Sequence, residues 1–147
     1  MYNFCFIFGD CGKNENVEQE IYEAIKEEYD RCGIYEFIVE YWNPFGLQAM
    51  RAVMRLREEH EEVWLRILLP CEDAKEPAEI RRMIDGYFVP EWNVKMSFEA
   101  GRYRTRRYMV LRAVSLVCRP GKSRSVRQMI DFAQIDAERG TVRMRVI

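Results

Sequence analysis

The residues with the clearest chemical potential follow an apolar segment near the C-terminus, where Gly121, Lys122 and Ser123 precede a helical pattern that contains Ser125. The first turn of a helix offers free N–H groups and the positive end of the helix dipole, so it favours anions. A glycine lets the backbone approach an anion closely, and the lysine and serine side chains add donors for phosphate oxygens. The alternative is a plain turn in which Ser123 only caps the helix. A P-loop is excluded, because that motif needs a glycine where Leu116 stands.

A second pair of candidate residues, Gly9 and Asp10, ends the first apolar segment. One hypothesis is that Gly9 admits a ligand and that the Asp10 carboxylate accepts a hydrogen bond from a ribose hydroxyl. The other is a simple turn that continues to Gly12. After the second apolar segment, Asn43 is followed by Pro44, which is stiff and has no N–H group to donate. We therefore expect poor phosphate contact at that loop.

A third feature is the helical segment 98–112, which is rich in arginine. Its length cannot place all of these arginines on one face, so most are expected in solvent. Arginines that alternate with tyrosines also suggest nucleic-acid binding, but the sequence pI is about 6.0 and no known nucleic-acid-binding module is present. Nucleic acid is therefore not an expected partner. The arginines of this segment are Arg102, Arg104, Arg106, Arg107 and Arg112.

An alternation of apolar and helical segments must position these residues, and it predicts parallel strands joined by helices. The segment between 71 and 97 is the least regular, with a small extended segment or lid at 87–92. Strands are predicted at 3–8, 34–41, 63–69, 113–118 and 141–147, and helices at 15–31, 45–60, 77–85, 98–112 and 123–138.

The predicted fold class is α/β. We expect a Rossmann-like three-layer sandwich of about five mostly parallel strands in the order 3-2-1-4-5, formed by a single domain over residues 1–147. This order places the first and fourth strands side by side, with the topological switch between them. Sheets of this kind bind ligands in the crevice at the carboxyl ends of the strands at that switch. The loops of Gly9 and Gly121 are then expected to face each other across the crevice.

Composition limits the class of protein further. No run of about 18 apolar residues predicts a membrane span, and the N-terminal residues carry no secretion signal. The five cysteines form no CxxC pair and the chain has one histidine, so we expect reduced thiols, a cytoplasmic location, no metal site and no cofactor. Charge is unevenly placed: residues 1–99 hold 11 Lys and Arg against 21 Asp and Glu, and residues 100–147 hold 12 against 3. The two halves either pair with each other or leave a basic rim around an anion site.

Four ordered motifs resemble those of the SLOG superfamily, in particular its small YpsA-like branch, which is related to LOG-type phosphoribohydrolases. The pattern Phe-Gly-His-Arg of that branch is matched by Phe8-Gly9-Asp10, and its Gly-Gly-Phe-Asp by Asn43-Pro44-Phe45-Gly46. Its Arg-Trp-Met-Val is matched by Arg107-Tyr108-Met109-Val110. The LOG-type pattern Pro-Gly-Gly-x-Gly-Thr-x-x-Glu is aligned with residues 120–128, in which Ser125 stands for the threonine.

The resemblance implies a Rossmann-like domain that binds a nucleotide or a related phosphorylated metabolite. It also implies that Asn43 and Gly46 border the ligand and that Arg107 faces a phosphate. The place of the catalytic glutamate is taken by Gln128, so the resemblance favours binding over catalysis.

Three hypotheses follow. The first is a binding protein for a nucleotide or a phosphorylated metabolite. The second is a hydrolase that cleaves an N-glycosidic or phosphate linkage in a nucleotide, with Asp10 or Glu40 replacing the missing glutamate. The third is a structural homodimer whose pocket has closed. An open basic crevice favours binding, a carboxylate aimed into the crevice favours chemistry, and side chains that fill it favour the third.

Overall fold

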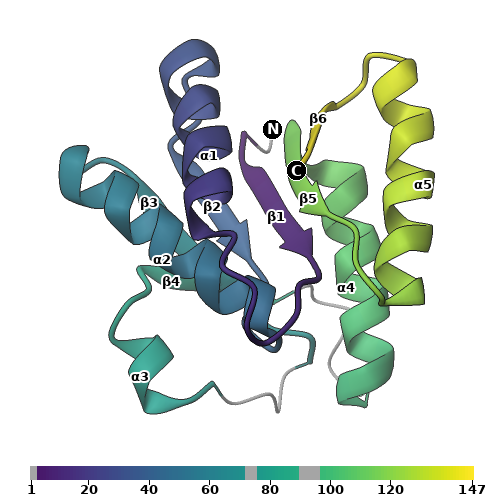
Figure 1. Ribbon diagram of the computed structural model, residues 1–147, viewed down its shortest axis with the longest axis horizontal. Coiled ribbons are helices and arrows are strands. Elements are labelled where there is room, and N and C mark those ends of the chain that lie inside the picture. Colours follow the sequence, from purple (N-terminus) through teal and green to yellow (C-terminus); the bar gives the residue numbers. More distant parts are fainter. Residues whose placement is uncertain (1–2, 72–75, 90–96) are drawn as a thin grey trace.

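The computed structural model of the protein describes residues 3–71, 76–89 and 97–147 and consists of one parallel β-sheet between two layers of helices (Figure 1). All five strand pairs of this sheet are parallel, and the strand order is β4-β3-β2-β1-β5-β6. The strands are β1 (Cys5–Gly9), β2 (Glu36–Val39), β3 (Trp64–Leu68), β4 (Gly86–Phe88), β5 (Ser115–Arg119) and β6 (Arg143–Val146). The helices are α1 (Glu18–Cys32), α2 (Pro44–Glu59), α3 (Ala78–Arg81), α4 (Phe98–Arg112) and α5 (Arg124–Glu138).

The α/β prediction is confirmed, with one additional strand. The five predicted strands occupy the expected order, and β4 joins the sheet beside β3 at its edge. An extended segment or lid was predicted at 87–92. Its first residues are extended, as part of strand β4, and residues 90–92 lie outside the described part of the chain. The helix expected at 77–85 is shorter, because α3 ends at Arg81 and the chain turns into β4.

The central strands β1, β2 and β5 are buried on both faces because their side chains alternate between two apolar clusters. On β1, Cys5 and Ile7 face the layer of α1 and α2, whereas Phe6 and Phe8 face α4 and α5. The four side chains are fully buried. A strand covered by helices on both faces has no polar side, which explains the continuous apolar segments in the sequence.

Local capping sets where the long helices begin. Asn43 precedes α2, and its side-chain oxygen accepts a hydrogen bond from Gly46 N at 2.7 Å. The side-chain oxygens of Ser97 and Ser123 cap α4 and α5 in the same way. These caps satisfy N–H groups that a helix start leaves without a backbone partner. Helices α2 and α5 begin shortly after the carboxyl ends of β2 and β5.

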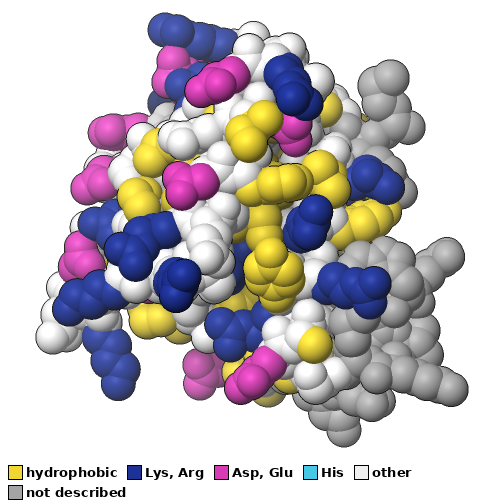
Figure 2. All heavy atoms as spheres, turned by 90° about the vertical axis from the view of Figure 1, so that its right-hand side faces the viewer, with side chains coloured by type: hydrophobic (Ala, Val, Ile, Leu, Met, Phe, Trp, Pro, Cys, Tyr) yellow, Lys and Arg dark blue, Asp and Glu magenta, His cyan; other side chains and the backbone are white. Residues whose placement is uncertain are grey.

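The charged halves of the chain pair with each other across the fold. Among the described residues, arginines of the C-terminal half form ion pairs with glutamates of the N-terminal half: Arg106–Glu40, Arg119–Glu15, Arg143–Glu28 and Arg145 with Glu27 and Glu28. Other basic side chains remain at the surface formed by α4 and α5, where they surround a band of hydrophobic side chains (Figure 2). Among the described residues, no helix is long and apolar enough to cross a bilayer.

Candidate functional site

The candidate site lies where β1 and β5 end side by side. Gly9 and Arg119 are paired across these strands, and Asp10 N donates a hydrogen bond to the Arg119 carbonyl at 3.0 Å. The sheet continues beyond β1 with β2, β3 and β4, and beyond β5 with β6. The topological switch therefore falls between the first and fourth predicted strands, as the sequence indicated.

The loops after β1 and β5 are joined by a direct contact. Ser123 N, just before α5, donates a hydrogen bond to Asp10 Oδ2 at 2.8 Å. A Cβ atom on Gly121 would lie 2.7 Å from the same oxygen, so a glycine is needed there to admit the carboxylate. The Asp10 carboxylate thus occupies the anion-favouring end of α5, where the sequence analysis expected a phosphate. The glycine serves the close approach of the protein's own anion.

An open cleft of about 400 Å³ borders this contact. The loop after β1 lines it with Asp10, Cys11, Gly12 and Glu15, and the loop after β5 lines it with Arg119, Pro120, Gly121 and Lys122. One loop therefore supplies two carboxylates and the other supplies two cations. Of the predicted ligand-binding residues, this cleft brings together Asp10, Gly121 and Lys122.

Glu15 and Arg119 are held in place inside the cleft. Glu15 Oε1 accepts a hydrogen bond from Gly12 N at 2.6 Å, and its Oε2 lies 2.8 Å from Arg119 Nη2. The Gly12 N–H first, and the Arg119 guanidinium second, lower the pKa of the Glu15 carboxyl. Arg119 Nη1 also donates to the Asp10 carbonyl at 3.0 Å. Lys122 is exposed, and no hydrogen bond or ion pair holds its ammonium group within the described part of the chain.

Asn43 and Gly46 hold the start of α2 against the sheet. Besides capping the helix, Asn43 donates from Nδ2 to the Gly9 carbonyl at 3.3 Å. A Cβ atom on Gly46 would lie 1.8 Å from the Glu40 carbonyl oxygen, which leaves no room for any other side chain. Neither residue lines the cleft. Their polar atoms and their small size are used within the fold.

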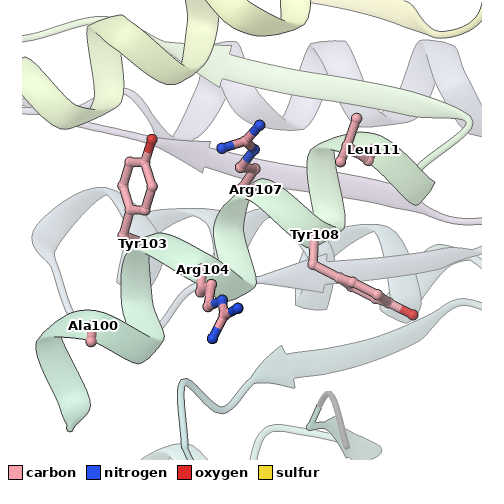
Figure 3. Close-up of a pocket in the computed structure, with 6 residues that line it drawn as sticks. All are labelled: Ala100, Tyr103, Arg104, Arg107, Tyr108 and Leu111. Carbon is pink, nitrogen blue, oxygen red and sulfur yellow. The ribbon is translucent and has the colours of Figure 1, made fainter. Parts of the chain in front are cut away.

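Arg107, expected to face a phosphate, lies on the outer side of α4 (Figure 3). Its guanidinium carbon is 5.1 Å from the centre of the Phe132 ring on α5. Gln128, which the resemblance aligned with a catalytic glutamate, lines a hollow between α4 and α5 together with Arg107 and Phe132. Both residues therefore lie outside the cleft between β1 and β5.

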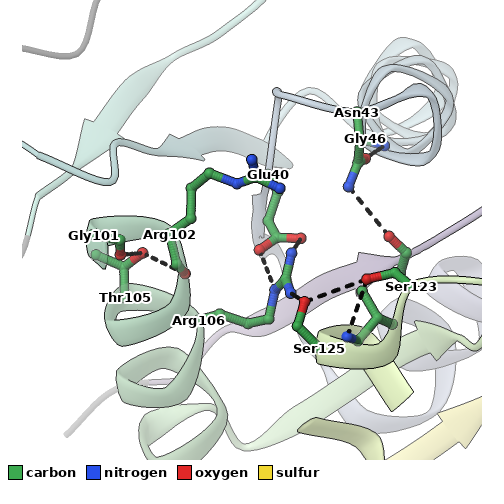
Figure 4. A network of polar contacts seen from close by, with 11 residues as sticks. Glu40, Asn43, Gly46, Gly101, Arg102, Thr105, Arg106, Ser123 and Ser125 are labelled. Carbon is green, nitrogen blue, oxygen red and sulfur yellow. Dashed lines mark hydrogen bonds and ion pairs between the residues drawn. The ribbon is translucent and has the colours of Figure 1, made fainter. Parts of the chain in front are cut away.

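The preceding arginine, Arg106, points inward (Figure 4). Its guanidinium makes two bonds to the Glu40 carboxylate, at 2.6 Å from Nε and 3.1 Å from Nη2. Nη1 lies 3.4 Å from Ser125 Oγ, which in turn lies 3.3 Å from Ser123 Oγ. The side chains of Arg106 and Glu40 are only 3% and 1% exposed. Burial raises the pKa of the Glu40 carboxyl, although the Arg106 guanidinium opposes that change.

Sequence reasoning missed Arg106 as an inward residue, yet the signal was present. Met109 and Val110 are apolar residues three and four positions further along α4, and such positions share a face with Arg106. Both are buried against the sheet with Gly101 and Thr105. A helix rotates by about 100° per residue, so Arg107 points away when Arg106 faces the sheet.

Cys11 borders the cleft, but its thiol is buried. Cys11 is 7% exposed, its sulfur accepts a hydrogen bond from Gln48 Nε2 at 3.7 Å, and burial raises its thiol pKa. Burial also raises the pKa of Cys5 and Cys118 to about 12. These thiols stay protonated at neutral pH and are poor nucleophiles.

Trp42 packs within the protein. Its ring makes edge contacts with Tyr41 and Phe98, and the Arg102 guanidinium carbon lies 5.5 Å from its centre. Trp92 lies outside the described residues. Within residues 3–71, 76–89 and 97–147, no group of three or more His, Cys, Asp or Glu side chains is arranged to hold a metal ion.

No protein-family model matches this chain, and a search of curated proteins finds no match. The resemblance to SLOG domains therefore stays a prediction, and the interpretation of the site depends on its geometry.

Proposed function

We propose that the protein binds a nucleotide or a related phosphorylated metabolite in the cleft between the loops that follow β1 and β5. The observation that carries this proposal is the distribution of charge at the topological switch. Carboxylates come from the loop after β1, cations come from the loop after β5, and the space between them is about 400 Å³. That volume falls in the usual range for small-molecule pockets, about 300–1,000 Å³.

The chemistry of a nucleotide matches this pair of loops. Its ribose hydroxyls are donors for carboxylate oxygens such as those of Asp10, and its phosphates are acceptors for an ammonium group. Lys122 is exposed at the cleft and has no intramolecular partner among the described residues, so it can turn toward a phosphate. Arg119 is already paired with Glu15, and we assign it a supporting role.

The position of Asp10 supports a second candidate, a structural protein whose pocket has closed. The Ser123 N–H at the start of α5 is bound to the Asp10 carboxylate, in the place where a ligand phosphate would sit in an open site. A ligand must therefore bind beside Asp10, through Lys122, or displace it. Removing the Asp10 carboxylate separates these cases.

The proposal contains no reaction. Both oxygens of Glu40 are bound by Arg106, and the side chain is buried away from the cleft. Asp10 accepts a backbone hydrogen bond, and Glu15 is paired with Arg119. Asp10 and Glu40, the carboxylates considered for the hydrolase hypothesis, are thus engaged in holding the fold.

We also place the protein in the cytoplasm. All five cysteines carry free thiols, which is typical of a reducing compartment. The proposal includes a small-molecule ligand and leaves nucleic acid and membranes out.

The test is a thermal-shift panel of nucleoside mono-, di- and triphosphates, ribose 5-phosphate and inorganic phosphate. A ligand present at 100 times its Kd stabilises the native state by about 2.7 kcal/mol. For a chain of this size, that free energy raises Tm by about 5–10 °C. Lys122→Ala should abolish most of the shift, and the matched control Lys26→Ala, on the middle of α1, should leave it unchanged.

Asp10→Ala distinguishes the two candidates. A shift in the wild type supports the binding function. No shift in the wild type but a shift in Asp10→Ala supports the closed pocket. No shift in either protein at millimolar ligand would rule out this cleft as a nucleotide site.

A further inference from the structure

A second hollow surface lies along the outer face of α4 and shares no residue with the cleft. Six residues line it, and they recur at the spacing of one helix face: Ala100, Tyr103, Arg104, Arg107, Tyr108 and Leu111 (Figure 3). The hollow encloses about 640 Å³ and its walls are almost wholly apolar. We call these six residues the α4 groove.

The α4 groove is more apolar than a solvated helix face requires. The inner face of α4 packs on the sheet through Met109 and Val110, and Tyr108 packs against the same cluster beside Phe88. Tyr103, Arg107 and Leu111 are not part of this cluster. On that outer face, Tyr103 is 47% exposed and Leu111 is 49% exposed. A contiguous exposed apolar surface of this kind marks a docking site in many soluble proteins.

The groove continues onto α5. A neighbouring hollow of about 260 Å³ shares Tyr103 and Arg107 with it and is closed by Met129 and Phe132. Tyrosine, methionine and arginine are the residue types most enriched at protein interfaces. The combined surface is therefore a shallow apolar channel between two helices, with an arginine at its centre.

We propose that the α4 groove docks an amphipathic helix of another protein that carries carboxylates beside its apolar face. The lining spans about three helical turns, which matches the length over which a docked helix presents anchors at i, i+3, i+4 and i+7. The groove supplies the apolar floor for these anchors, and Arg107 supplies the charge that selects an acidic helix.

Charge decides against a second copy of the chain as the occupant. Arg107 lies in the middle of the surface, with its guanidinium over the Phe132 ring. Residues 98–147, which include α4 and α5, hold 12 Lys and Arg against 4 Asp and Glu. A two-fold contact through this face would bring like charges together, whereas an acidic helix would neutralise them. The surface shares no residue with the cleft between β1 and β5, so this inference is independent of the proposed ligand.

The test uses two fluorescein-labelled helical peptides and the full-length protein. Both peptides carry leucines at i, i+3, i+4 and i+7; one has glutamates beside this stripe, and its twin has lysines. Fluorescence anisotropy should show that the acidic peptide binds at least about tenfold more tightly than its twin. Arg107→Glu should reverse that preference. Leu111→Ala should weaken binding of the acidic peptide about tenfold.

The control is Arg51→Glu, the same substitution at an exposed arginine. Arg51 lies on α2, which covers the opposite face of the sheet. It should change neither affinity. Equal affinity for the two peptides, or no binding of either, would overturn the proposal. So would a dimer in solution that Leu111→Asp dissociates, or a single-stranded oligonucleotide that binds the same residues more tightly than the acidic peptide.

Discussion

Replacing Arg106 by methionine tests whether the buried ion pair between Arg106 and Glu40 stabilises the fold. The Glu40 side chain is 1% exposed, and the variant removes the guanidinium that binds both of its carboxylate oxygens at 2.6 and 3.1 Å. Breaking a buried pair by removing one partner costs about 3–5 kcal/mol, because the other charge stays buried without compensation. We expect Arg106→Met to lower the free energy of unfolding by that amount at pH 7.

The neighbouring arginine is the matched control. Arg107 is exposed and lies on the outer face of the same helix. Arg107→Met should therefore change the free energy of unfolding by less than about 0.5 kcal/mol. Replacing both partners by apolar residues, as Glu40→Leu with Arg106→Met, should recover most of the loss, since no charge is then buried.

The pH dependence of Arg106→Met has a definite sign. Burial raises the pKa of the Glu40 carboxyl in the folded protein, and loss of the guanidinium that opposes this change raises it further. The folded state then takes up a proton more readily than the unfolded chain. Arg106→Met should be less stable than the double variant, which lacks the carboxyl. This difference in the free energy of unfolding should shrink as the pH falls toward the ordinary pKa of a carboxylic acid. It should grow again as the pH rises through the folded-state pKa.

Urea unfolding followed by circular dichroism at several pH values measures all of these quantities. A loss below about 1 kcal/mol in Arg106→Met would refute the reasoning, since the pair would then contribute no more than a surface ion pair. The same conclusion would follow if the double variant were as unstable as the single one.

Two further predictions concern the loops at the sheet edge. Gly46→Ala should lower the free energy of unfolding by about 3 kcal/mol or more, because its Cβ would lie 1.8 Å from a backbone oxygen. Gly86→Ala is the control, because the nearest atom to its Cβ is 3.7 Å away. Urea unfolding of this control should show a change below about 0.5 kcal/mol. The Glu15 carboxyl should titrate below its ordinary pKa in a carbon-detected NMR experiment, because of the Gly12 N–H and the Arg119 guanidinium, and Arg119→Met should raise that midpoint. The contribution of Glu15 to stability is then present above its ordinary pKa and is lost as the pH falls through its folded-state value; an unchanged midpoint in Arg119→Met would show that the two side chains do not pair in solution.

Much of the fold followed from local patterns. Short apolar segments such as 3–8 predict buried strands. Gly33 marks the end of a helix and Ser123 the start of another. The rule that parallel crossovers are right-handed then limits the strand order to a few choices. The edge strand β4 was predicted only as an extended segment or lid, because its three residues, Gly86–Phe88, pair on one side only and are half-exposed or exposed.

The candidate site was predicted less completely. The sequence placed the loops of Gly9 and Gly121 together, and the structure brings them into contact through Asp10. The sequence did not predict that the Asp10 carboxylate, from the loop after β1, would bind at the anion-favouring start of α5. That contact joins residues 113 positions apart, and no periodic pattern or turn signal encodes such a distance.

The sequence by itself determined the alternation of strands and helices, the β1–β5 switch and the separation of acidic and basic halves. These features depend on local propensity and on the short connections that follow from it. Only the tertiary structure decided that Arg106 is buried and Arg107 is exposed, and that Asp10 is bound to the start of α5. The phase of a helix is set by the surface on which it packs, and a step of one residue turns a side chain by about 100° from the core toward solvent.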